Sequence, residues 1–366
     1  MKLYKNFHLL ILVFICIYVC SCTDEIIVEE TPVEIHTRVN SESDKSSAAL
    51  FFWDSKTFND LWLKNQGSPK PIYGPAVLTN DIDYYKNETG NTFTVGLEYP
   101  KNVNEYIYAT GYAPDNVLEI TSDYKTLDIK DNVEITTIAK TDFLCCDGKQ
   151  EHKGAASDLF TKSEHELKFR HLAPRIRFVG IRDEVMYGAI SVNNVKVTLK
   201  STKNLYVPSQ FKYRLNQDNT MQTYVASDFK SISKDLPLTQ DTQDYIPANS
   251  EGLSLMSCYI FNTDNLNSSG YDPFAIYNEI ENGNEIILNI DVSADFSWYK
   301  DDGLPVKFDS PQWNDSKVKI KLKHVGNCFF PGYEYVVRII FKRESIILQG
   351  VQENWEDGGI HYLPVS

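Results

Sequence analysis

The sequence lacks the short motifs that mark the common enzyme active sites. It has no Gly-x-Ser-x-Gly nucleophile turn, no phosphate-binding loop and no Gly-x-Gly-x-x-Gly dinucleotide-binding turn. In HELKFRH, five residues separate His165 from His171, whereas two zinc ligands on one helical face need three residues between them. We therefore predict no catalytic residues, no metal site and no cofactor, and a protein that is not an enzyme.

Cysteine, methionine and basic charge are also scarce. The 366 residues include seven Cys and four Met, and 36 Lys and Arg stand against 50 Asp and Glu, for a net charge of −14. The cysteines are too few and too scattered for a disulfide-stapled fold, although a bridge between Cys258 and Cys328 stays open. An acidic chain without clustered Lys and Arg argues against nucleic acid as a partner, because neutralising phosphates requires such clusters.

Only the N-terminus carries a long apolar run. Lys2 and Lys5 precede an apolar stretch over residues 9–19, which is shorter than the roughly 20 residues that span a bilayer. A charged start and a short apolar core are typical of a secretory signal, here residues 1–21.

The signal ends in the sequence Val-Cys-Ser-Cys, which resembles a bacterial lipobox. Signal-peptidase cleavage is accordingly expected between Ser21 and Cys22, with Cys22 as the lipidated first residue of the mature chain. Each buried methylene of its acyl chains contributes about 0.8 kcal/mol, so two or three chains, such as palmitate, anchor a protein without a spanning helix. The acidic stretch TDEIIVEE that follows resembles the surface-export signal of Bacteroides-type lipoproteins, which predicts a surface-exposed outer-membrane location.

The rest of the chain shows the period-two alternation of strands with one buried face. In VKIKLKHV, the apolar residues Val318, Ile320 and Leu322 alternate with lysines. The same alternation is seen in EYVVRIIF, EIILNIDV, VKVTL, TFTVGLEY and LKFRHLAPRIRFVGI, with Gly-containing turns between strands. Only residues 54–65 predict a short helix, with Asp54 as its cap. The pattern is typical of an all-β protein made of antiparallel sandwiches.

Several of these segments resemble the fimbrillin-like proteins, the type V pilins of Bacteroides-type bacteria. The closing segment FPGYEYVVRIIFKRESIILQGVQENWEDGG has that family's Pro-Gly turn, Tyr-rich strand, second strand and Trp followed by Gly. Upstream, YIYATGYAP, TDFLCC, LKFRHLAPRIRFVGI and ISVNNVKVTL follow the family's order and spacing. The resemblance spans roughly residues 90 to 359.

The resemblance implies two transthyretin-like β-sandwich domains in tandem, export as a lipoprotein and assembly into surface fimbriae. In this family an Arg-specific protease trims the N-terminus, and a strand from a neighbouring subunit fills the groove that the lost strand leaves. The implied organisation is a tether and removable first strand over 22–45, an N-terminal sandwich over 46–183 and a C-terminal sandwich over 184–366. The implied partners are other pilin subunits, the outer membrane and a host or bacterial surface ligand.

The segment TPVEIHTRV carries the residues expected to act in strand exchange, namely Val33, Ile35 and Thr37. Arg38 is the first basic residue after Cys22, so we expect a trypsin-like cut there, although an ordinary first strand with an exposed Arg fits equally well. At the other end, Ile360 and Tyr362 share one side of the C-terminal tail, which is either a donor strand or a closing strand.

This tail is shorter than the C-terminal extension of the family's shaft subunits. The sequence therefore favours a tip, anchor or minor pilin with structural and adhesive roles. The alternative is a stand-alone outer-membrane lipoprotein that binds glycans, which would require Tyr or Trp rings that are coplanar and solvent-facing at a loop end.

Overall fold

A computed structural model describes the following parts of the chain: 32–38, 47–58, 60, 67–78, 91–98, 107–147, 167–184, 190–202, 204–215, 222–238, 245–246, 252–262, 284–299, 305–323 and 328–354. These residues form three β-sheets and two one-turn helices. The prediction of an all-β protein is therefore confirmed. Within the described residues fifteen strand pairs are antiparallel, and three, β1 with β9, β10 with β20 and β19 with β21, are parallel.

The first sheet has seven strands, all from the N-terminal half of the chain. In spatial order they are β3 (Tyr73–Leu78), β2 (Ala48–Asp54), β5 (Ile107–Ala113), β8 (Leu144–Asp147), β9 (Leu167–His171), β1 (Pro32–Arg38) and β4 (Asn91–Glu98). Strand β2 is buried along nearly its whole length, with Leu50, Phe52 and Trp53 fully inside. A strand covered on both faces reads as a continuous apolar run, as AALFFW does.

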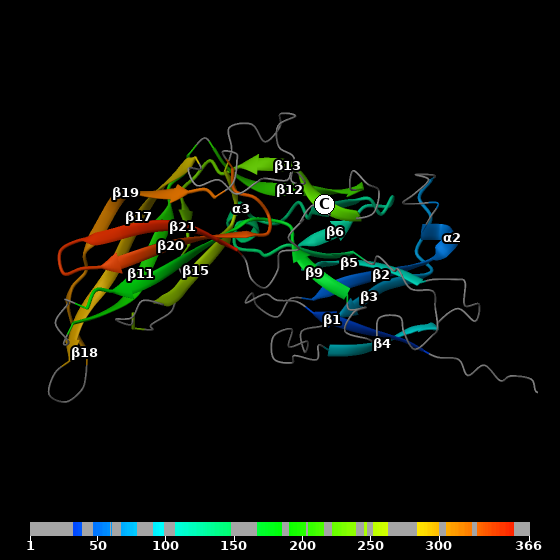
Figure 1. Ribbon diagram of the computed structural model, residues 1–366, viewed down its shortest axis with the longest axis horizontal. Coiled ribbons are helices and arrows are strands. Elements are labelled where there is room, and N and C mark those ends of the chain that lie inside the picture. The colour runs from blue at the N-terminus through cyan, green and yellow to red at the C-terminus, as the bar shows by residue number, and fades with distance from the viewer. Residues whose placement is uncertain are drawn as a thin grey trace, which may run out of the picture.

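The second sheet has nine strands and forms the other lobe in Figure 1. In order they are β14 (Leu236–Pro237), β11 (Ile190–Leu199), β17 (Glu285–Tyr299), β19 (Gln312–Lys321), β21 (Ile346–Asn354), β20 (Tyr333–Phe341), β10 (Arg175–Arg182) and β15 (Leu253–Tyr259), with β18 (Pro305–Asp309) also paired to β17. The predicted alternation is confirmed, because Val318, Ile320 and Leu322 are fully buried.

The parallel pair of β10 and β20 is joined by side chains as well as by backbone. The Arg177 guanidinium donates two hydrogen bonds to the Glu334 carboxylate, at 2.9 and 2.8 Å. Arg175 lies 3.3 Å from the same carboxylate. Such two-pronged Arg–carboxylate bonds fix geometry as well as adding energy, so they set the register of two strands that are far apart in sequence.

The third sheet combines strands from the two halves of the chain. Its order is β13 (Gln222–Ser231), β12 (Leu205–Leu215), β7 (Thr126–Ile129) and β6 (Leu118–Ile120), with β16 (Phe261–Asn262) also paired to β12. The β12–β13 hairpin therefore pairs with β7 across the domain boundary predicted between residues 183 and 184. In Figure 1 this hairpin lies above the lobe that contains the first sheet. The boundary itself stays a prediction.

The two helices, α2 (Ser55–Phe58) and α3 (Ile135–Ile138), are one turn each. Asp54 caps α2 as expected, since its Oδ1 accepts hydrogen bonds from the Thr57 amide at 2.7 Å and the Thr57 hydroxyl at 2.8 Å. None of the described helices is long and apolar enough to cross a membrane.

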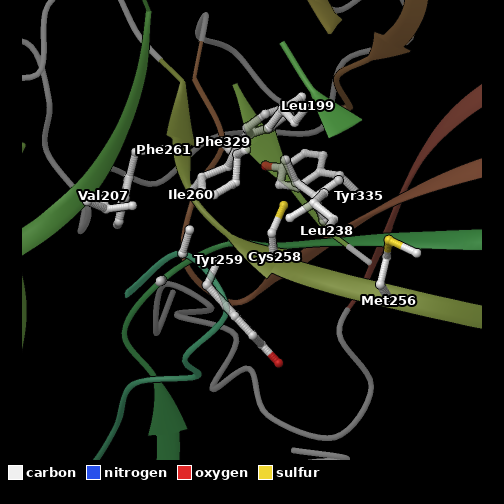
Figure 2. Packing of buried hydrophobic residues seen from close by; sticks show 14 of the residues in the cluster. Leu199, Val207, Leu238, Met256, Cys258, Tyr259, Ile260, Phe261, Phe329 and Tyr335 are labelled. Carbon is white, nitrogen blue, oxygen red and sulfur yellow. The ribbon is translucent and has the colours of Figure 1, made fainter. Parts of the chain in front are cut away.

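The core is continuous between the two lobes. Figure 2 shows Cys258, Tyr259, Ile260 and Phe261 in a row, with Phe261 beside Val207 of β12. The backbone amide of Tyr259, the last residue of β15, donates to the carbonyl of Ala139 at the end of α3, at 2.7 Å. One apolar cluster includes residues of all three sheets, so the lobes pack together through buried surface.

Tyr335 adds a buried polar contact to this core. Its hydroxyl accepts the amide hydrogen of Phe330 at 3.0 Å, and burial raises the pKa of the phenol well above its ordinary value. The Tyr335→Phe variant removes the acceptor and so breaks this buried hydrogen bond. We expect a loss of about 1–3 kcal/mol in the free energy of unfolding, measured by urea denaturation. Tyr206→Phe, at a half-buried position, is the control and should cost less; an equal loss would contradict this reading.

Candidate functional site: the first strand and its neighbours

Strand β1 lies between β9 and β4 in the seven-stranded sheet. It pairs with β4 in antiparallel register, with Ile35 opposite Phe93 and Thr37 opposite Asn91. A register shift between Pro32 and Glu34 interrupts the start of this pairing. Within the described residues β4 pairs with β1 alone, so β1 is what attaches β4 to the sheet.

The contact between β1 and β9 is much shorter. It is parallel and consists of two register pairs, Thr37 with Leu167 and Arg38 with Lys168. Arg38 is thus both the last residue of β1 and one of the two residues that align β1 with β9. A cut after Arg38 would detach the whole of β1 from the chain that follows.

Strand β9 is fixed firmly on its other side. It pairs with β8 through Leu144 and His171, and the Leu172 amide donates to the Phe143 carbonyl at 2.7 Å. The His171 ring Nδ1 lies 2.8 Å from Asp142 Oδ1, and both side chains are about 1% exposed. This buried pair ties the end of β9 to the segment before β8.

The His171–Asp142 pair also accounts for the histidine of the HELKFRH segment. Among the described residues no group of three His, Cys, Asp or Glu is placed to hold a metal ion. The pair connects two strands inside a core, which is a structural role. His165 lies outside the described residues.

The structure places the sequence-predicted exchange residues together. Val33, Ile35 and Thr37 all lie on β1, and Arg38 ends it. The other predicted site residues lie outside the described residues: Ser21, Cys22, Ile360 and Tyr362. Their lipidation, cleavage and strand-donor roles remain predictions.

The open question of a disulfide is answered. Cys258 and Cys328 form no disulfide, and neither do the adjacent Cys145 and Cys146; all four are buried. Burial raises the pKa of the Cys328 thiol to about 12 and raises the pKa of the Cys258 thiol further. These thiols stay protonated at neutral pH and behave as small core side chains.

A second feature, at the opposite end of the molecule, was not expected from the sequence. Trp298 of β17 and Phe308 of β18 stack with ring centroids 4.7 Å apart and ring planes 10° from parallel. Both rings are exposed, Trp298 by 46% and Phe308 by 37%. In Figure 1 β18 lies at the end of its lobe that points away from β1 and β4. The only sequence signal is that Phe296 and Trp298 share one face of β17.

The reverse face of this hairpin carries a polar network centred on Asp295. Its carboxylate lies 2.7 Å from Lys307 Nζ and accepts hydrogen bonds from Ser310 at 2.9 Å and Asn194 at 3.0 Å. Partial burial by itself raises the pKa of the Asp295 carboxyl, but the hydrogen bonds outweigh it and hold the pKa below its ordinary value. The network joins β11, β17 and β18, and so fixes the hairpin that carries the stacked rings.

No protein-family model matches the sequence, and a search of curated proteins gives no match. Among solved structures, a fimbrial protein from Bacteroides vulgatus is 14% identical, with 88% of this chain and 99% of that chain covered and a TM-score of 0.45. The tip fimbrial protein Mfa3 from Porphyromonas gingivalis, with a C-terminal truncation, is 11% identical, with coverages of 88% and 98% and a TM-score of 0.37.

Replacing His171 tests the anchor of β9. His171→Leu leaves the buried Asp142 carboxylate without its partner, so we expect a loss of about 3–5 kcal/mol in the free energy of unfolding. The double variant His171→Leu/Asp142→Leu removes both polar groups and should recover a large part of that loss. Urea denaturation of the three proteins measures both effects. A double variant that is less stable than the single one would show that these two side chains also stabilise the fold through contacts other than the one between them.

The Asp295 network predicts a specific pH dependence. Because the folded state lowers the pKa of Asp295, its contribution is complete above the unfolded pKa of about 3.9 and is lost as the pH falls through the lower folded pKa. Asp295→Asn should therefore be less stable than the parent protein at pH 7, and this difference should shrink as the pH falls below the unfolded pKa and through the lower folded pKa. Urea midpoints across this range measure it, with the exposed Asp131→Asn as control. A difference that stays constant with pH would refute the assignment.

Proposed function

We propose that this protein is a structural and adhesive subunit of a bacterial surface fimbria, assembled by β-strand addition. It is not an enzyme, and its role is that of a tip, anchor or minor pilin. The observation that supports the proposal most directly is the position of β1, which lies between β9 and β4 and ends at Arg38, the residue where the sequence predicts processing.

The geometry of β1 suits removal and replacement. Its removal would leave unpaired N–H and C=O groups on the edges of β9 and β4 that β1 had paired with. Another extended strand can pair with such groups, and its alternate side chains can fill the pockets of the lost strand. Strand β9 is held by the His171–Asp142 pair and by β8, so its edge would stay in position after β1 is lost.

Export and anchoring complete the proposal. The leader and lipobox predict a mature chain that starts at lipidated Cys22 and reaches the surface-exposed side of the outer membrane. The partners are then the outer membrane through this lipid and other pilin subunits through strand addition. The N-terminal tether between Cys22 and β1 would be lost with β1 when Arg38 is cut, which releases the subunit from its anchor as it is incorporated.

The mature N-terminus tests this proposal directly. Mass spectrometry of sheared surface filaments should find a species that begins at Val39, whereas the outer membrane should contain the chain that begins at acylated Cys22. Arg38→Ala should abolish the Val39 species because the protease loses its basic recognition residue. Lys45→Ala, the next basic position, is the matched control and should leave the cut unchanged.

Two outcomes would contradict parts of the proposal. An acylated Cys22 found only in membrane, with no Val39 species in filaments, would remove the strand-exchange step and favour a stand-alone surface lipoprotein. A mature chain without acylation at Cys22 would remove the lipid anchor.

A further inference from the structure

The stacked rings at the β17–β18 hairpin form a surface feature that the assembly proposal does not use. Trp298 lies between Ile190 of β11 and Val306 of β18 in the strand register, and it stacks diagonally on Phe308. Phe308 stacks on the indole of Trp298, and both side chains stay exposed, Trp298 by 46% and Phe308 by 37%. A flat aromatic surface is thereby presented at the free end of the lobe.

Other aromatic side chains, which lead from the surface into the core, hold the two rings in place. Phe308 meets the fully buried Phe296 edge to face, with centroids 6.3 Å apart, and Phe296 in turn contacts Trp313 at 6.3 Å. Trp313 contacts the buried Phe341 at 5.9 Å. This series of aromatic contacts runs from the core to the surface, and the Asp295 network fixes the opposite face of the hairpin. The exposed ring is therefore pre-organised, which lowers the entropy cost of binding.

The size of the exposed surface limits what can bind. Aromatic side chains have about 150–250 Å² each, so the exposed fractions of 46% and 37% leave roughly 150–200 Å² for the two rings together. A stable protein partner needs about 800 Å² from each side. The aromatic surface thus suits one small, flat molecular face and is too small to serve alone as a protein interface.

The acidic charge around the two rings further limits which ligands can bind there. The exposed residues that follow Phe308 are Asp309 and Ser310, and the chain as a whole carries a net charge of −14. An acidic surface repels nucleic acids and acidic sugars. Lys307, the cation of the described part of β18, is already paired with Asp295.

We propose that Trp298, supported by Phe308, binds a neutral hexose or N-acetylhexosamine residue of a surface glycan. One face of such a sugar presents C–H groups that carry partial positive charge, and the face of an indole is negative, so the two attract. The exposed carboxylate of Asp309, next to Phe308 in the chain, offers a hydrogen-bond acceptor to a sugar hydroxyl at the rim. This inference deepens the proposed adhesive function and rests on it for its biological setting, but its binding test needs no assembly.

The test is binding of the purified mature chain to an immobilised array of neutral oligosaccharides with terminal glucose, galactose, mannose, N-acetylglucosamine or N-acetylgalactosamine. The oligosaccharides that bind are then titrated in solution by calorimetry. Trp298→Ala should weaken binding at least tenfold, and Trp298→Phe, which keeps an aromatic face, should weaken it less. Ile287→Ala, which truncates another exposed apolar residue of β17 (48% exposed), is the matched control and should bind as the parent protein does.

Folding of each variant is verified by its urea midpoint, so that lost binding is not mistaken for lost structure. The proposal is overturned if no neutral oligosaccharide binds, or if binding by a folded Trp298→Ala protein stays within twofold of the parent. Failure here is distinguishable from failure of the assembly proposal, because Trp298→Ala should leave the Val39 terminus in sheared filaments unchanged. Sugar binding without that terminus would instead describe a stand-alone glycan-binding lipoprotein.

Discussion

The arrangement of the first sheet depends on the backbone hydrogen bonds of β1. A strand with no neighbour leaves a row of polar N–H and C=O groups to find other partners, and β4 has only β1 among the described strands. On its other side, β1 meets β9 over two register pairs that end at Arg38. One short strand therefore decides whether β4 stays on the sheet and whether β9 presents an open edge.

The proposed exchange of β1 would change one end of the molecule and leave the end with the β17–β18 hairpin as it is. The lobes share a continuous apolar core, and buried polar contacts such as His171 with Asp142 fix individual strands within it. At the far end the β17–β18 hairpin is fixed on one face by aromatic contacts and on the other by Asp295 and its partners. In the proposed assembly, replacement of β1 would leave the aromatic surface in place, so attachment to a fimbria would be separate from binding of a ligand.

Much of the secondary structure could be predicted, because strand alternation is a local property. VKIKLKHV and EYVVRIIF each show their buried face in the sequence, and the structure buries Ile320 and Tyr335 as expected. The Pro331-Gly332 turn was also identified, and Gly332 adopts the positive φ of +83° that glycine tolerates best. The segment TPVEIHTRV was predicted to form a strand from its alternation, and β1 lies within it, whereas the exchange and processing roles stay predictions.

The sequence by itself thus determined the class of fold and the buried faces of strands such as β19 and β20. The tertiary structure alone decided which strands are neighbours: the parallel pair of β10 and β20, the pairing of the β12–β13 hairpin with β7, and the place of β1 between β9 and β4. It also decided that Trp298 and Phe308 stack at the surface and that His171 meets Asp142. The physical reason is that alternation depends on residues two apart, whereas strand order depends on burial and hydrogen bonds between segments that are distant in the chain.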